Sequence, residues 1–237
     1  MDQGALGLRV NRGKAELVEL PLTSREPNVV RRNIEARLQR DGAASLAVNY
    51  EVRGSAAPGW RRRFGAESTR RERVIEMLGG EWAGFSLGPG GTSLTVSDLD
   101  DVEAPVRLAA RGSLAEFAER EGKTYSLEVT PRLRLTSSFA SLSHREQSVR
   151  LLGVPGVDDT FVVRLPPSMR VRSLPRALSG ETEFGRFGVE VSSDNAVVSV
   201  RSSLTLATAY VPPNKYQQFR KFCADVDQAF SQQLVVE

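Results

Sequence analysis

The chain has 237 residues, a formal net charge of +3 and one cysteine, Cys223. Its length is enough for one large or two medium β domains, and 40% hydrophobic against 26% charged residues exclude a chain that is disordered throughout. A single cysteine excludes an internal disulfide and a cysteine-built metal cage, and no apolar run reaches the length of a membrane-spanning helix.

The N-terminal lead-in segment contains two short apolar stretches, Leu6 to Val10 and Leu17 to Leu20. The turn-forming residues Asn11-Arg12-Gly13 separate them. This pattern is compatible with a small hairpin or with an extended strand, and the residues leave both open.

Residues 33–52 predict the hairpin around which the rest of the fold is built. Apolar and polar residues alternate on both sides of the turn. Residues paired across antiparallel strands point to the same face, so the two apolar rows meet only if the loop has three residues and ends at Gly42. That loop pairs Leu38 with Ala44 and Ile34 with Val48. The polar residues on the opposite face are then Glu35, Arg37, Asn49 and Glu51.

A break in the chain is expected at residues 56–59, followed by a helix. Thr69 and Glu72 have the spacing of a capping box, and Gly79-Gly80 would end the helix. The aromatic residues that flank this helix and would anchor it to the sheet are Trp60, Phe64 and Trp82.

The middle of the chain predicts short strands and one short helix. Strands are expected at Leu94 to Val96, from Val106 onward, and from Tyr125 to Leu135. Pro131 makes the last of these an edge strand or a strand with a kink at that point. Ser113 and Glu116 have capping-box spacing, which predicts a helix of at most two turns.

The second half predicts one strand after another and a closing helix. Ser192 to Asn195 are expected to lie in an even-numbered loop that pairs Val189 with Val198. Pro212-Pro213 would open the terminal helix. The apolar stripe of that helix consists of Tyr216, Phe219, Phe222, Cys223, Val226, Ala229 and Phe230.

These patterns predict a mainly β protein with an antiparallel β-sandwich-like architecture, two packed sub-domains and two or three short helices. The turn at residues 153–156 is the expected boundary. The chain then divides into a lead-in segment (1–22), a first β-rich sub-domain with one arginine-rich helix (23–152), and a second β-rich sub-domain that ends in a helix (153–237).

The C-terminal motif Tyr216-x-x-Phe219-Arg220-x-Phe222, followed by Asp225-x-Asp227-x-Ala229, resembles the closing helix of a bacterial module of unknown function. That module follows a transglutaminase-like core in large cell-envelope proteins. Further matching landmarks, over roughly Leu20 to Val236, are Asp41-Gly42-Ala43, Gly54 with Ala56-Ala57 before Arg61 and Arg62, Arg145 before a strand, Leu165-Pro166 and Leu174-Pro175.

The resemblance implies that a catalytic cysteine, histidine and aspartate lie upstream of the module, so none of them is assigned to this chain. It implies a protein partner, which would be the transglutaminase-like domain. We expect no cofactor. The compartment depends on context: the cell envelope or periplasm for a piece of an exported protein, and the cytoplasm if the chain is complete as given.

An arginine cluster near the predicted helix is the candidate partner surface. It comprises Trp60, Arg61, Arg62, Arg63, Arg70, Arg71 and Arg73. Guanidinium groups can track phosphates, and Trp60 could stack on bases. However, Glu67, Glu72 and Glu76 are interleaved and would form helix pairs, and the remaining charge is balanced. A solvated face or an acidic protein partner is therefore favoured over nucleic acid.

Other chemistries have weaker support. Cys223 lies mid-helix beside aromatic residues, which is typical of a small core residue rather than a nucleophile paired with His144. The acidic residues Asp98, Asp100, Asp101 and Glu103 lack the glycine and distal glutamate of a helix–loop–helix calcium site. Asp158-Asp159 is likewise interpreted as solvated. The glycine-rich residues 88–92 lack the lysine of a phosphate loop.

The leading hypothesis is a non-catalytic structural or protein-interaction module that accompanies a transglutaminase-like or cysteine-protease-like partner. Two alternatives remain open. One is a nucleic-acid-binding protein that uses the arginines of residues 61–73, and the other is a cysteine hydrolase that uses Cys223 and His144.

Overall fold

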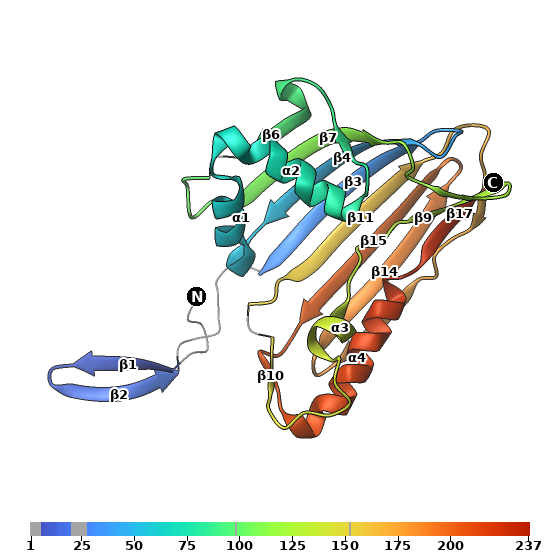
Figure 1. Ribbon diagram of the computed structural model, residues 1–237. Coiled ribbons are helices and arrows are strands. Elements are labelled where there is room, and N and C mark those ends of the chain that lie inside the picture. Colours follow the sequence, from blue (N-terminus) through green and yellow to red (C-terminus); the bar gives the residue numbers. More distant parts are fainter. Residues whose placement is uncertain (1–5, 20–27, 98, 152) are drawn as a thin grey trace.

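The computed structural model describes residues 6–19, 28–97, 99–151 and 153–237 (Figure 1). Strands dominate, so the prediction of a mainly β protein is confirmed. The predicted C-terminal helix is present at Tyr216–Ala229, and a short strand, Gln233–Val236, follows it. Four α-helices are present among the described residues, where two or three were expected.

A nine-stranded sheet forms the centre of the molecule. Its strands run in the order β13-β14-β15-β11-β3-β4-β7-β5, and β6 also pairs with β7. The pair β3 and β11 is parallel, whereas the other neighbours are antiparallel. The strand bounds are β3 Val29–Leu38, β4 Ala44–Val52, β5 Ser86–Leu87, β6 Leu94–Val96, β7 Val106–Leu114, β11 Gly156–Arg164, β13 Leu178–Thr182, β14 Gly185–Asp194 and β15 Val197–Leu206.

Helices cover one face of this sheet. Trp60 lies 5.0 Å from Tyr50 of β4, and Phe222 lies 6.0 Å from Phe187 of β14, measured between ring centroids. Tyr50 and Phe187 point to the same face, so both helical layers pack on that side (Figure 1). The helices are α1 Ala57–Phe64, α2 Glu67–Glu81, α3 Leu135–Phe139 and α4 Tyr216–Ala229, with 3-10 turns at Gly54–Ala56, Gly91–Ser93 and Pro213–Lys215.

The opposite face of the sheet carries mostly polar and charged side chains, including the four polar residues predicted for the 33–52 hairpin. A smaller sheet packs its apolar side, with Leu127 and Leu234, into the shared core. Its order is β12-β17-β9-β8, with β12 Val171–Ser173, β17 Gln233–Val236, β9 Thr124–Glu128 and β8 Glu119–Glu121. A further pair joins β10 Val149–Arg150 to β16 Tyr210–Val211.

The predicted register of the 33–52 hairpin is confirmed. Leu38 pairs with Ala44, and Ile34 pairs with Val48. Gly42 has a φ of +89°, and a Cβ at this position would lie 2.9 Å from the ring of Tyr125. The loop therefore needs glycine both for its backbone conformation and for the close approach of the small sheet.

The lead-in segment contains a hairpin, one of its two predicted forms. Strands β1 Leu6–Asn11 and β2 Lys14–Glu19 pair with each other. Figure 1 shows this hairpin standing away from the main body. Leu20, the end of the second predicted apolar stretch, lies outside the described residues.

The break expected at residues 56–59 is wrong, because α1 begins there. Pro58 occupies the first helical turn, where the amide that proline lacks has no helical partner in any case. The predicted capping box is also wrong, since α2 begins at Glu67, before Thr69. The helix continues through Gly79-Gly80 to Glu81.

Three further expectations differ from the structure. Ser113 lies in β7, opposite Ser45 of β4, so no helix starts at that residue. The strand that begins near Tyr125 ends at Glu128, and Leu135 begins α3 instead. Strands β14 and β15 are joined by a two-residue turn, which pairs Val189 with Ser202 rather than Val198.

The sub-domain boundary near residue 153 stays a prediction. Strands from both sides of it are hydrogen-bonded to each other, at β3–β11 in the large sheet and at β9–β17 in the small one. Of the helices in the described part of the chain, none is both long and apolar enough to cross a bilayer.

Candidate functional site

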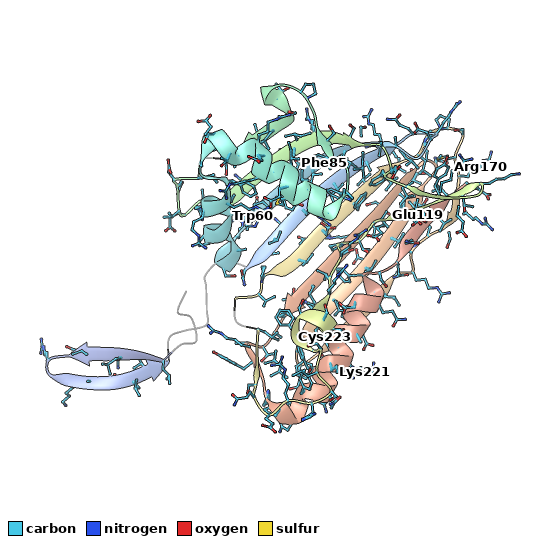
Figure 2. The ribbon with its side chains drawn as sticks, viewed as in Figure 1. Trp60, Phe85, Glu119, Arg170, Lys221 and Cys223 are labelled. Atoms are coloured by element: carbon cyan, nitrogen blue, oxygen red, sulfur yellow. The ribbon has the colours of Figure 1, made fainter. Side chains whose placement is uncertain are left out.

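The arginine cluster lies on α1 and α2, and its aromatic member belongs to the core. Trp60 is half-buried, with its ring centroid 5.0 Å from Tyr50 and 5.4 Å from Phe64. Figure 2 labels Trp60 at α1, beside the sheet. The indole is thus occupied by packing, which leaves less of its surface for stacking on a base.

Three of the six guanidinium groups bind backbone carbonyls. Arg61 donates to the carbonyl oxygens of Asp101, at 2.9 Å, and Ala104. Arg70 donates to Phe64 at 2.7 Å and Gly65 at 3.2 Å, at the end of α1. The third of these groups, Arg71, donates to the carbonyl oxygen of Gly88 at 2.8 Å. These groups hold loops against the two helices.

The other three arginines of the cluster are not hydrogen-bonded to backbone carbonyls within the described residues. Arg62 is exposed. Arg63 lies over the ring of Phe64 and 3.5 Å from the carboxylate of Glu76, while Arg73 donates to Thr69 at 3.3 Å. The partner surface over residues 60–73 stays a prediction, and Arg62, Arg71 and Arg73 are its exposed arginines.

The proposed nucleophile–base pair has unfavourable surroundings. Cys223 is fully buried on α4, and burial, to which the negative charge of Asp227 adds, raises the pKa of its thiol to about 12. His144 is exposed in the connector before β10, where its Nδ1 lies 3.3 Å from the hydroxyl of Ser143. A cysteine nucleophile needs the opposite conditions, namely access and a lowered pKa.

A buried ionic network is a feature that sequence reasoning missed. Arg32 of β3 donates from Nε and Nη2 to the two carboxylate oxygens of Asp159 on β11, at 2.6 Å and 3.0 Å. Arg32 also binds Glu81 at the end of α2 and lies over the ring of Trp82. Tyr50 donates to Glu81 at 3.1 Å.

The interpretation of Asp158-Asp159 as solvated is therefore wrong. Asp159 is 1% exposed, and Asp158 on the other face accepts a hydrogen bond from Arg31 at 2.9 Å. Burial disfavours the charge of Arg32, but the hydrogen bonds and charge of Asp159 outweigh it, so the pKa of Arg32 is raised. The network joins β3, β11 and α2 around one guanidinium group.

The acidic turn after β6 is shaped by its own backbone. Asp101 accepts hydrogen bonds from the amides of Glu103 and Ala104, at 3.0 Å and 3.2 Å. Asp98 lies outside the described residues. In the part of the chain that the structure describes, no group of three or more histidine, cysteine or acidic residues is arranged to hold a metal ion.

The β1–β2 hairpin carries the most unusual surface. Leu6, Leu8 and Val10 of β1 and Leu17 of β2 are 72%, 64%, 67% and 70% exposed. The pairing of Leu8 with Leu17 and of Val10 with Ala15 puts all of them on one face. The opposite face carries the ion pair between Arg9 and Glu16.

Residues 123–236 match the model of a family described as a Domain of Unknown Function with solved-structure structure (DUF3858). The matched segment begins just before β9 and includes α4 and β17. It thus contains the closing-helix motif on which the resemblance to a module of unknown function rests. No curated protein matches the chain.

Among solved structures, the chain is similar to a protein from Parabacteroides distasonis ATCC 8503 that is described as a candidate protease. The two are 14% identical with a TM-score of 0.38, and the alignment covers 48% of this chain. The alignment spans only 23% of the length of that protein.

Proposed function

We propose that this chain is a non-catalytic module that docks onto a transglutaminase-like protein domain through the apolar face of its β1–β2 hairpin. The observation that carries the proposal is the row of large apolar side chains on that face, each more than 60% exposed. The match to a family of unknown function at residues 123–236 supports the module part of the proposal.

An isolated two-stranded hairpin is marginally stable in water. Within the described residues, β1 and β2 pair only with each other, so neither the nine-stranded sheet nor the smaller sheet supports them. Contiguous exposed apolar patches of a few hundred Å² mark interaction sites in soluble proteins. The hairpin is therefore stabilised most simply by a partner that covers its apolar row.

The chemistry of the apolar face favours a protein partner. Nucleic acid is bound by cations that neutralise phosphates, and leucine and valine side chains supply none. Three of the six clustered arginines already bind backbone carbonyls. The buried thiol of Cys223, with its raised pKa, supports the non-catalytic part of the proposal.

The proposal is tested by calorimetric titration of the whole chain with a transglutaminase-like domain from the same organism. We expect binding with a negative heat-capacity change, because apolar surface is buried. The double substitution Leu8→Ser and Leu17→Ser should weaken binding by at least about 100-fold, since burial of each leucine contributes roughly 1.5–3 kcal/mol.

Lys14→Ala is the matched control, because Lys14 pairs with Asn11 on the opposite face of the hairpin. It should change the affinity less than about twofold. Equal binding by the leucine variant would place the contact elsewhere. A homodimer that the leucine substitutions dissociate would show that a second copy covers the face, which contradicts the proposed partner.

A further inference from the structure

A hollow with a volume of about 680 Å³ lies between the end of α2 and the small sheet. Its walls are the last turn of α2 with the following Trp82 and the segment 114–118 that leads from β7 to β8. Residues from the outward face of the small sheet complete it: Glu119, Ser126, Glu128 and Gln233. Figure 2 labels Glu119 on the side of the molecule away from the hairpin. The volume lies within the roughly 300–1,000 Å³ of known ligand pockets.

The lining of the hollow is acidic, although the whole chain has a net charge of +3. Five carboxylates line it: Asp41, Glu81, Glu116, Glu119 and Glu128. Two of these carboxylates are paired with an arginine: Glu81 with Arg32, and Glu128 with Arg132. Asp41, Glu116 and Glu119 form no ion pair within the described part of the chain.

The remaining arginine of the lining does not neutralise these three carboxylates. Arg120 donates to the carbonyl oxygen of Gly122 at 3.1 Å, and its guanidinium group lies over the ring of Tyr125. The unpaired charges of the lining are thus three carboxylates against one cation, Arg120.

Two further features of the hollow favour a positive charge. The carboxyl end of α2 carries the negative end of the helix dipole, and residues 79–81 at that end line the hollow. The half-buried rings of Trp82 and Phe117 also contribute to the lining, and aromatic faces attract ammonium and guanidinium groups. Arg32 already lies over the ring of Trp82 and Phe117 stacks on Phe161, so this contribution is secondary to that of the carboxylates.

We propose that this hollow binds a basic peptide segment, whose lysine or arginine side chains meet Asp41, Glu116 and Glu119 beside Trp82 and Phe117. A polypeptide is favoured over a free amine because β8 borders the hollow. In the described residues β8 pairs with β9 alone, so its outer edge has backbone groups available to an extended segment. This site lies on different elements from the hairpin and is independent of the docking proposed above.

In the test, the whole chain is titrated with a blocked heptapeptide of alternating lysine and glycine, and binding is measured by calorimetry. The salt concentration is about 20 mM, at which screening of charges is weak. We expect binding that the double substitution Glu116→Gln and Glu119→Gln weakens about tenfold. The same peptide with acetylated lysines, which lack the positive charge, should not bind.

The matched control is Glu181→Gln with Glu190→Gln, two exposed carboxylates on β13 and β14 of the large sheet. This control removes the same charge far from the hollow and should change affinity less than about twofold. If the control variant lost as much affinity for the peptide, the effect would be one of overall charge, and the proposed site would be wrong. The proposal would also be overturned if the peptide did not bind, or if the Glu116 and Glu119 variant bound it as tightly as the unchanged protein. A chain that binds the free amine spermidine but not the peptide would overturn it too.

Discussion

The lone thiol shows how strongly a single position depends on its surroundings. Cys223 lies on the apolar side of α4 between Phe219, Phe222 and Val226, all of them buried. Its surroundings favour the neutral form, so the native protein keeps its thiol proton at pH values where an unfolded chain, with a thiol pKa near 8.5, would lose it.

This difference predicts a loss of stability in alkali. Because the folded pKa of about 12 exceeds the unfolded value, the contribution of the thiol to stability is fully present below about pH 8.5 and falls as the pH rises toward 12. Urea unfolding between pH 7 and pH 11 should show this decline, and it should be smaller in Cys223→Ala. An equal decline in both proteins would contradict the buried, neutral thiol.

The core role of Cys223 could be predicted from sequence, because its neighbours along the helix define the apolar stripe. The arginine cluster could be predicted only as a cluster. The carbonyl groups that bind Arg61 and Arg71 belong to loops about 17 to 43 residues further along the chain. Local spacing carries no information about contacts of that kind, and so the guanidinium groups that bind backbone carbonyls could not be predicted.

Among the elements, α3 depends on a side chain from another helix. Its own N-cap residue, Arg134, makes no capping hydrogen bond with its side chain. Instead, the carboxylate of Asp227 on α4 accepts hydrogen bonds from the amides of Leu135 at 2.7 Å and Thr136 at 2.9 Å. A negative group at the start of a helix also interacts favourably with the helix dipole.

Asp227→Ala should therefore destabilise the protein by about 1–2 kcal/mol, the usual cost of a lost N-cap. The control is Asp225→Ala, which removes the neighbouring carboxylate of the same helix and its exposed pair with Lys221. That change should cost no more than about 0.5 kcal/mol. Urea denaturation compares the two variants, and equal losses would exclude the capping role.

The elements differ in how well sequence predicts them. The 33–52 hairpin was predicted to the residue, because parity and a glycine loop leave one register that buries both apolar rows. The two capping-box predictions failed, since that motif is four residues long and competes with tertiary pairing. Ser113, for example, is held in β7 by the neighbouring strand β4.

At the scale of the whole molecule, the nine-stranded sheet is joined at one parallel seam. Strands β3 to β7 lie on one side, and β11 and β13 to β15 lie on the other. The register of β3 and β11 puts Arg32 opposite Asp159 on the covered face and Arg31 opposite Asp158 on the other. A slip of one residue would turn the buried pair outward, so the charges specify the register.

Loss of the inner pair should cost far more than loss of the outer one. Asp159→Asn leaves a buried guanidinium group without its main partner, which typically costs about 3–5 kcal/mol. Asp158→Asn affects a partly exposed pair and should cost at most about 1 kcal/mol. Replacing both inner partners, as Arg32→Met with Asp159→Leu, should recover most of the loss. Urea denaturation midpoints measure all three, and equal costs for the two aspartates would contradict this ranking.

The seam is also the part of the fold that sequence predicted least well. A parallel pair between strands so far apart has no local signature, and a pair of adjacent aspartates is typical of a solvated turn. To predict the parallel pair, one would have to recognise Arg32 and Asp159 as partners. The residues next to each of them in the sequence do not indicate this.

The two halves of the seam are separated by 127 residues of sequence. As the chain leaves the ribosome, β3 and β4 can pair early, but the outer edge of β3 must wait for β11. During that interval a strand with a strongly apolar side has an open edge, the situation in which nascent chains aggregate. Because this long-range contact lies at the centre of the sheet, we expect the protein to fold slowly for its size.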